Sequence, residues 1–300
     1  MDSLAGNIYA KDSDLIIFSD GPKTENDRPQ VTEVREFIRT IQSFKSVRIV
    51  ESESNKGLAN SIINGVTEVL KLTDNVIVLE DDLVTSPYFL QYMNDGLNQY
   101  QEDERVVSIH AYIYPVKEKL PETFFIRGSD CWGWATWKRS WLLFEPDGVK
   151  LLRQLESQNL GYEFNFYGCY PYMKMLKDQI KGRNNSWAIR WYASTFLAGG
   201  LTLYPSASLI RNIGHDGSGV HSLKSNHYEY LVDLSPRRIL LEKIEVVENK
   251  AAKRIIAEFH KKQQSFVNAV IRKIKTFVRQ CMSGLSPLIL ISIPDYWGFF

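Results

Sequence analysis

Cysteine is scarce in this chain of 300 residues, which has only Cys131, Cys169 and Cys281. The three cysteines are odd in number and far apart. The sequence therefore shows neither a disulfide framework nor the paired spacing of a zinc site. This use of cysteine fits the reducing environment of the cytosol.

Long apolar segments are also missing. No run reaches the roughly 18 apolar residues that suggest a membrane-spanning helix. Residues 1–14 lack a basic stretch followed by an apolar one, so they do not resemble a signal peptide. We expect a cytoplasmic protein, with peripheral contact to the inner face of the plasma membrane as an alternative placement.

A strong net charge is absent as well, because the formal charge is +1. The chain therefore lacks the overall positive charge of a nucleic-acid-binding protein, and no nucleic-acid partner is expected. The charge is unevenly distributed, however. Residues 250–279 hold nine Lys and Arg and one acid, Glu258, and the pattern predicts a long helix with a basic and an apolar face. Such a helix either packs on the rest of the protein or touches anionic lipid through residues 250–282.

Apolar runs alternate with helical patterns in the first half of the chain. The runs at residues 15–18, 47–50, 76–79 and 106–109 predict strands, and the segments between them have helical periodicity. This alternation predicts an α/β fold with a mostly parallel, Rossmann-type sheet flanked by helices. The second half is rich in Trp and Tyr and has little clear periodicity.

Three consecutive carboxylates follow the third predicted strand. Val76–Leu79 ends directly in Glu80, Asp81 and Asp82. Unpaired buried charge is costly, so these residues belong at the surface, where a strand-end turn is the simplest interpretation. Ligands of open α/β sheets bind beside the carboxyl ends of the strands, and carboxylate oxygens suit Mg²⁺ or Mn²⁺ carrying a phosphate group.

Polar residues follow the other strands too. Asp20 follows the first strand, where a Ser-Asp-Gly-Pro turn without a ligand is the alternative. Asn55 follows the second strand. Parallel strands would direct all these side chains to one rim. A later segment, residues 214–221, has three glycines whose amides suit a diphosphate, or it is a flexible loop with incidental histidines.

Several motifs, taken in order, resemble nucleotide-sugar glycosyltransferases of the GT-A fold. They are LIIFSDGPK from residue 15, RIVESESNKGLANSIINGVTEVL from residue 48 and NVIVLEDDLVTSPYFLQYMNDGL from residue 75. The Glu-Asp-Asp-Leu segment is similar to the Asp-X-Asp equivalent of the N-acetylglucosaminyltransferase I group, and the Asn-Lys-Gly-Leu-Ala segment is similar to family-two inverting enzymes. The segment CWGWATW from residue 131 is similar to bacterial relatives in cell-surface polysaccharide synthesis. The resemblance covers roughly residues 10–222.

The resemblance implies a GT-A-like catalytic domain over residues 1–247 whose first strand is missing, followed by a helical extension over residues 248–300. It implies a divalent cation, Mn²⁺ or Mg²⁺, with Asp82 as a metal ligand and His221, or else His215, as a further contact to metal or phosphate. Asp20 would lie near the nucleobase and Glu80 and Asp81 near the ribose. Asn55 belongs to the same predicted binding set.

The catalytic base is less well defined. The N-acetylglucosaminyltransferase I group would place an Asp between Trp187 and Trp191, where this chain has Ala188, Ile189 and Arg190. Asp130 and Asp216 are the remaining candidates, and a surface turn is an equal interpretation of Asp130. Trp132, Trp134 and Trp137 are expected mainly in the core or in a pocket wall.

The expected reaction is metal-dependent transfer of a hexose or N-acetylhexosamine from a nucleotide-sugar donor to a saccharide or lipid-linked acceptor. Inversion is expected by analogy alone. Two alternatives remain. A nucleotidyltransferase would also use an α/β sheet with a carboxylate-bound cation, although the expected glycine-rich loop with Arg or Lys after its first strand is not seen. A homologue without its first strand would bind ligands and lack turnover.

Overall fold

The four predicted apolar strands are present in the computed structural model, which describes residues 1–214 and 232–265. They are β1 (Asp14–Ser19), β2 (Ser46–Glu51), β3 (Asn75–Val78) and β5 (Val106–His110). The helices between them are α2 (Arg28–Arg39), α3 (Leu58–Leu72) and α4 (Phe89–Gln99). The alternation of strands and helices is confirmed.

A five-stranded sheet forms the centre of the protein, and it is mixed. Its order is β3-β7-β5-β8-β6, where β6 is Thr123–Arg127, β7 is Trp134–Trp137 and β8 is Leu201–Pro205. β3 and β5 run in the same direction, as predicted, but β7 lies between them and is antiparallel to both. β5 and β8 are parallel, and β6 is antiparallel to β8. The expectation of a mostly parallel sheet thus holds for strand direction in β3, β5 and β8, while the neighbouring pairs are largely antiparallel.

One row of paired residues marks an edge of this sheet, which we call the Trp134 edge. Trp134 pairs with Val78 on one side and with His110 on the other. The chain therefore leaves β3 and β5 at the same edge at which it enters β7. This edge places the residues after Val78 beside those before Trp134.

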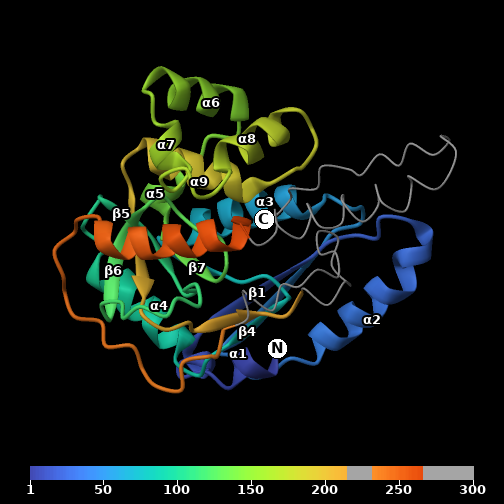
Figure 1. Cartoon of the computed structure of the whole chain (residues 1–300). Helices are drawn as coiled ribbons and strands as arrows, with labels where there is room; N and C mark the ends of the chain where they lie inside the picture. The colour runs from blue at the N-terminus through green and yellow to red at the C-terminus, as the bar shows by residue number, and fades with distance from the viewer. Residues whose placement is uncertain (215–231, 266–300) are drawn as a thin grey trace, which may run out of the picture.

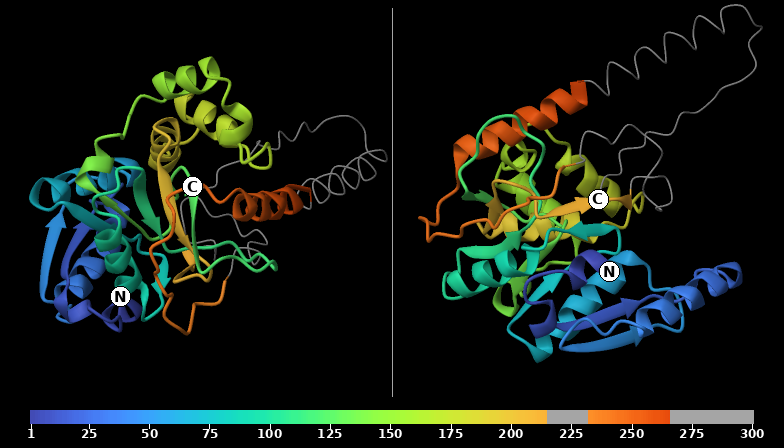
Figure 2. Two further views of the ribbon diagram at one scale, coloured as in Figure 1. Left: turned by 90° about the vertical axis from the view of Figure 1, so that its left-hand side faces the viewer. Right: turned by 90° about the horizontal axis from the view of Figure 1, so that it is seen from below.

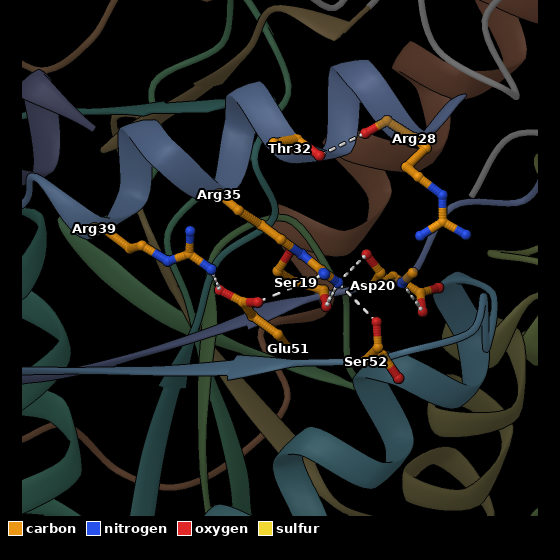
Figure 3. A network of polar contacts seen from close by, with 9 residues as sticks. Ser19, Asp20, Arg28, Thr32, Arg35, Arg39, Glu51 and Ser52 are labelled. Carbon is orange, nitrogen blue, oxygen red and sulfur yellow. Dashed lines mark hydrogen bonds and ion pairs between the residues drawn. The ribbon is translucent and has the colours of Figure 1, made fainter. Parts of the chain in front are cut away.

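The strands β1 and β2 form a separate parallel pair. α3 packs over β1, because a Cβ atom on Gly65 would lie 3.3 Å from the ring of Phe18. In Figure 3, Arg35 extends from α2 to the ends of both strands, where its guanidinium donates to the carbonyl oxygens of Asp20 (3.2 Å) and Ser52 (2.7 Å). Arg35 thus holds three elements together at the end where Asp20 lies, namely β1, β2 and α2.

A group of helices lies on the side of the sheet where Trp134 packs, and Figure 1 shows them gathered together. They include α6 (Gly148–Ser157), α7 (Gly161–Phe164), α8 (Tyr172–Ile180) and α9 (Trp187–Leu197); the short α5 (Lys138–Trp141) precedes them. The α6 and α9 N-termini are capped by side chains, since Asp147 accepts from two amides and Ser186 accepts from Ile189 N. Such caps satisfy helix amides that have no partner inside the helix.

Tryptophans form a second, smaller core beneath these helices. Trp134 stacks on Trp187 with ring centroids 5.4 Å apart and lies 5.8 Å from Trp191. Trp134 and Trp191 are fully buried, and Trp137 lies in the main core. The expected packing role is confirmed for Trp134 and Trp137, whereas Trp132 is half-buried.

The remaining elements are short. They are α1 (Asp2–Ala5), the 3₁₀ turns η1 (Ala10–Asp12) and η2 (Glu25–Asp27), and the strands β4 (Leu83–Thr85) and β9 (Ile210–Asn212), which pair in antiparallel.

The helix at residues 250–265 packs against the main core, where Ala252, Ile256 and Ala257 are buried. The views in Figures 1 and 2 place this orange helix beside the sheet. The expected apolar stripe from Phe266 to Val278 lies outside the described residues. Among the helices that the structure describes, none is long and apolar enough to cross a membrane.

Candidate functional site

The acidic segment leaves β3 at the Trp134 edge of the central sheet. Glu80 and Asp82 are half-buried, while Asp81 is exposed. Burial, together with the neighbouring carboxylates of Asp82 and Asp81, raises the pKa of Glu80 from 4.5 to about 8. The crowding of these three acids favours either a shared proton or a bound cation.

The antiparallel pair of β4 and β9 brings a distant segment to Asp82. Asn212 Nδ2 donates to Asp82 Oδ2 at 3.2 Å, and Ile213 N donates to the Asp82 carbonyl oxygen at 2.8 Å. Gly214 lies so close that a Cβ atom there would overlap the Asp82 carboxylate. The glycine-rich segment predicted to hold a diphosphate therefore starts directly against the predicted metal ligand.

Asp130 lies in the connection that enters β7 at this same edge. Its side chain is 9% exposed, so it is not a surface turn residue. The Tyr114 hydroxyl donates to Asp130 Oδ2 at 3.0 Å, and Cys131 N donates to Asp130 Oδ1 at 2.8 Å. The fully buried His110 places Nε2 3.7 Å from Asp130 Oδ2. Burial lowers the pKa of His110 to about 4, against the opposing effect of Asp130, so this imidazole is neutral near pH 7.

Cys131 connects Asp130 with the acidic segment. Burial and the negative charges of Asp130, Glu80 and Asp82 raise the pKa of its thiol well above 9.0. All three carboxylates therefore act electrostatically on one buried sulfur atom. These predicted site residues therefore lie near enough to Cys131 for their charges to act on its thiol.

A small cavity adjoins Asp130. Its walls include the rings of Phe166, Tyr172, Tyr192 and Tyr204. The cavity volume of about 10 Å³ suffices for about one water molecule and is too small for a sugar ring.

Asp20 and Asn55 form a second group at the ends of β1 and β2. Asp20 Oδ1 accepts from Gly21 N and Lys56 N, both at 2.8 Å, and Asp20 Oδ2 accepts from Gly57 N at 2.9 Å. Asn55 Nδ2 donates to the Gly21 carbonyl oxygen at 3.0 Å. The Asp20 carboxylate thus joins the turn after β1 to the residues that directly precede α3. This is a structural role, whether or not the carboxylate also contacts a ligand.

The donor set at Asp82 suits a hard divalent cation. Such cations take oxygen ligands, and Mg²⁺ commonly uses one or two carboxylates together with phosphate oxygens and water. Glu80, Asp81 and Asp82 offer this chemistry. Within the described residues, no group of three or more His, Cys, Asp or Glu side chains is arranged to hold a metal by itself. A site here would therefore need oxygen atoms of the substrate to complete it.

Asp216, His215 and His221 lie outside the described residues. Conversely, the structure adds two residues that the sequence argument did not select, Asn212 beside Asp82 and Tyr114 beside Asp130. The pairing of β4 with β9 joins segments about 130 residues apart, and no local pattern indicates such a pairing.

Comparison of the chain with models of known protein families and with characterised proteins finds no match. The class of protein established by the structure is therefore a mixed α/β protein with a central sheet flanked by helices.

Proposed function

We propose that this protein is a metal-dependent glycosyltransferase of the GT-A type that moves a sugar from a nucleotide-sugar donor to a saccharide or lipid-linked acceptor. One observation carries the proposal. A single edge of the central sheet gathers the acidic segment Glu80–Asp82, the start of the glycine-rich segment at Gly214, and the buried carboxylate of Asp130.

The donor side of this edge combines carboxylates with backbone amides. In the proposal, Asp82 holds Mn²⁺ or Mg²⁺, and Glu80 and Asp81 contact the ribose or metal-bound water. Asn212 fixes the Asp82 carboxylate through its amide. When bound, the cation supplies positive charge that offsets the charge developing on the leaving nucleoside diphosphate.

Asp130 is the proposed base on the acceptor side. Its carboxylate takes the proton of the attacking acceptor hydroxyl while the new glycosidic bond forms and the bond to the diphosphate breaks. Tyr114 and the Cys131 amide hold both carboxylate oxygens in place. A base on the face opposite the leaving group gives inversion at the anomeric carbon.

Turnover tests this proposal directly. UDP- and GDP-sugars are incubated with the full chain and Mn²⁺, and release of the nucleoside diphosphate is measured with water as the acceptor and with added saccharides. The proposal predicts release by the wild type. Asp130→Asn should lower kcat by at least about 100-fold, since a positioned base contributes roughly 10²–10⁴.

The matched control is Asp74→Asn, because Asp74 is exposed and precedes β3, at the end opposite the acidic segment. It should retain wild-type turnover. Absence of any donor cleavage would contradict the proposed activity, and full activity of a folded Asp130→Asn variant would place the base elsewhere.

A further inference from the structure

A second, larger hollow lies on the far side of the turn that closes the Asp130 cavity. It is a groove of about 860 Å³ between residues 162–169 and the helix at 250–265. This volume falls within the about 300–1,000 Å³ typical of small-molecule sites. We call it the tyrosine groove, since Tyr162 and Tyr167 line it.

The turn at residues 166–168 separates the groove from the Asp130 cavity. Phe166 (φ 49°) and Tyr167 (φ 57°) both adopt the left-handed conformation, which is uncommon for residues other than glycine. Phe166 lines the cavity of Asp130, whereas Tyr167 lines the groove. Two neighbouring residues in an unfavourable backbone conformation thus form the wall between the groove and the proposed base.

Aromatic surface is exposed in this groove. Tyr162 is 66% exposed, and its ring centroid lies 5.9 Å from that of Tyr167 at an angle of 44°. The buried Lys253 places Nζ 5.2 Å from the Tyr167 centroid, which holds this ring in position by a cation–π contact. The apolar faces of sugar rings pack well on such fixed and accessible aromatic rings.

Two cationic side chains that line the groove have no carboxylate partner among the described residues. The carboxylates of Glu163, Glu248 and Glu258 lie 3.7, 2.8 and 3.7 Å from Arg127, Lys253 and Lys261, respectively. Lys250 and Arg254, one helical turn apart, are exposed and form no ion pair with another residue of the part of the chain that the structure describes. Because only two cations lack an ion pair and the three carboxylates are all paired, the groove favours a ligand with a single anionic group over a polyanionic ligand.

We propose that the tyrosine groove binds an acceptor saccharide that carries an anionic group, with its ring on Tyr162 and Tyr167 and its carboxylate or phosphate at Lys250 and Arg254. This inference rests on the proposed function, which requires an acceptor. Because the turn at residues 166–168 separates the groove from Asp130, the groove holds a sugar unit of the acceptor other than the one that reacts. It defines the acceptor class by its chemistry. A sugar acid and a lipid-linked sugar phosphate share that chemistry and differ in the anion.

Calorimetry on the full chain, without any nucleotide, tests the groove. The carboxylate probe is methyl glucuronide, which carries one carboxylate, and its methyl ester is the neutral counterpart with the same ring. The phosphate probe is glucose 1-phosphate, with glucose and inorganic phosphate as its two components. One anionic sugar should bind at least about tenfold more tightly than its neutral counterpart, since charge-assisted hydrogen bonds are among the strongest polar contacts.

Three variants separate the contributions. Arg254→Gln should remove the preference for the anionic form, and Tyr162→Ala should weaken the charged and neutral forms alike. Lys262→Gln is the matched control, because Lys262 is exposed on the same helix but does not line the groove. Circular dichroism establishes that each variant is folded.

Equal binding of charged and neutral sugars, no binding of any probe, or an unchanged preference in Arg254→Gln would each overturn the proposal. Binding of inorganic phosphate as tightly as glucose 1-phosphate would also overturn it, since the groove would then recognise an anion without the sugar. Mn²⁺-dependent binding of UDP- and GDP-sugars is measured on the same preparation. If the nucleotide fails to bind while the saccharide binds, the proposed function is wrong and the groove assignment stands.

Discussion

Asp20 is a residue for which a binding role and a structural role lead to different expectations. Its carboxylate accepts hydrogen bonds from the amides of Gly21, Lys56 and Gly57. The resemblance to GT-A enzymes assigns the same residue to the nucleobase. The three amides account for the position of the Asp20 carboxylate without a ligand. A measurement of protein stability therefore tests its role most directly.

Replacing Asp20 with Ala should therefore destabilise the protein. The change leaves three amides without their acceptor, and one unsatisfied group costs about 1–3 kcal/mol when it is buried. Denaturant unfolding should show a loss in this range, whereas Asp12→Ala, an exposed acid in η1, should change little. Unchanged stability of Asp20→Ala would contradict the structural role of its carboxylate.

Local sequence patterns predicted the acidic segment but not the residues that contact it in the structure. Glu80–Asp82 follow an apolar run, a local signal. The local pattern Ser86-Pro87 is typical of a helix cap followed by the first helical residue. In the structure α4 begins at Phe89, while the Ser86 hydroxyl accepts from Tyr88 N at 3.4 Å and donates to the Ser235 carbonyl oxygen at 2.8 Å. No local pattern indicates this second bond, whose partner lies 149 residues away.

Among the elements, β7 shows most clearly where periodicity fails. Its residues Trp134–Trp137 are buried on both faces, so no alternation of polar and apolar residues marks the strand. The strand nevertheless lies between β3 and β5 and fixes where Asp130 enters the site. The predicted runs at β1, β2, β3 and β5 are short aliphatic segments bounded by polar residues, a pattern that can be recognised without tertiary contacts.

The helix at residues 250–265 carries a buried histidine whose ionisation should affect stability. His260 contacts Tyr114 and Tyr170 with ring centroids 4.6 and 4.7 Å apart, and neither of its nitrogens has a hydrogen-bond partner among the described residues. Burial lowers its pKa from 6.5 to about 3. The folded protein therefore keeps His260 neutral, while the unfolded chain takes up a proton below pH 6.5.

The contribution of neutral, buried His260 to the free energy of unfolding is fully present above pH 6.5. It is lost progressively as the pH falls from 6.5 towards 3. Between pH 7 and pH 5 the loss is about 2 kcal/mol for one such group. His110 should add a similar loss down to its pKa of about 4. Glu80, whose pKa is raised to about 8, acts in the opposite sense over this range, so the variant is compared with the wild type by difference. In urea unfolding at both pH values, His260→Phe should lack about 2 kcal/mol of the destabilisation that His260 causes in the wild type, and an unchanged pH dependence would contradict the burial of a neutral His260.

At the scale of the whole molecule, the segment after residue 247 belongs to the same core as the sheet. Ile256 is completely buried in the main core, although the sequence placed a domain boundary before it. Glu248 also pairs with β6 through a bridge to Phe125. Such contacts predict that the sheet and this helix unfold together.

Truncation of Ile256 to Ala should lower the free energy of unfolding by about 2–5 kcal/mol, the usual cost of a cavity in a core. Tryptophan fluorescence, which reports on the separate cluster around Trp134, should shift together with far-ultraviolet circular dichroism. Val247→Ala is the control, since Val247 is 51% exposed. Two separate transitions would show that the helix is an independent unit.

We propose that Asp82 and its neighbours hold a divalent cation and a nucleotide diphosphate at one edge of the sheet. Titration calorimetry of UDP- and GDP-sugars with and without Mn²⁺ tests it most directly. Binding should require Mn²⁺ and should weaken by at least about tenfold, or about 1.4 kcal/mol, in Asp82→Asn, while Asp74→Asn binds as the wild type does. Binding that needs no metal, or that is unchanged in Asp82→Asn, would contradict the account.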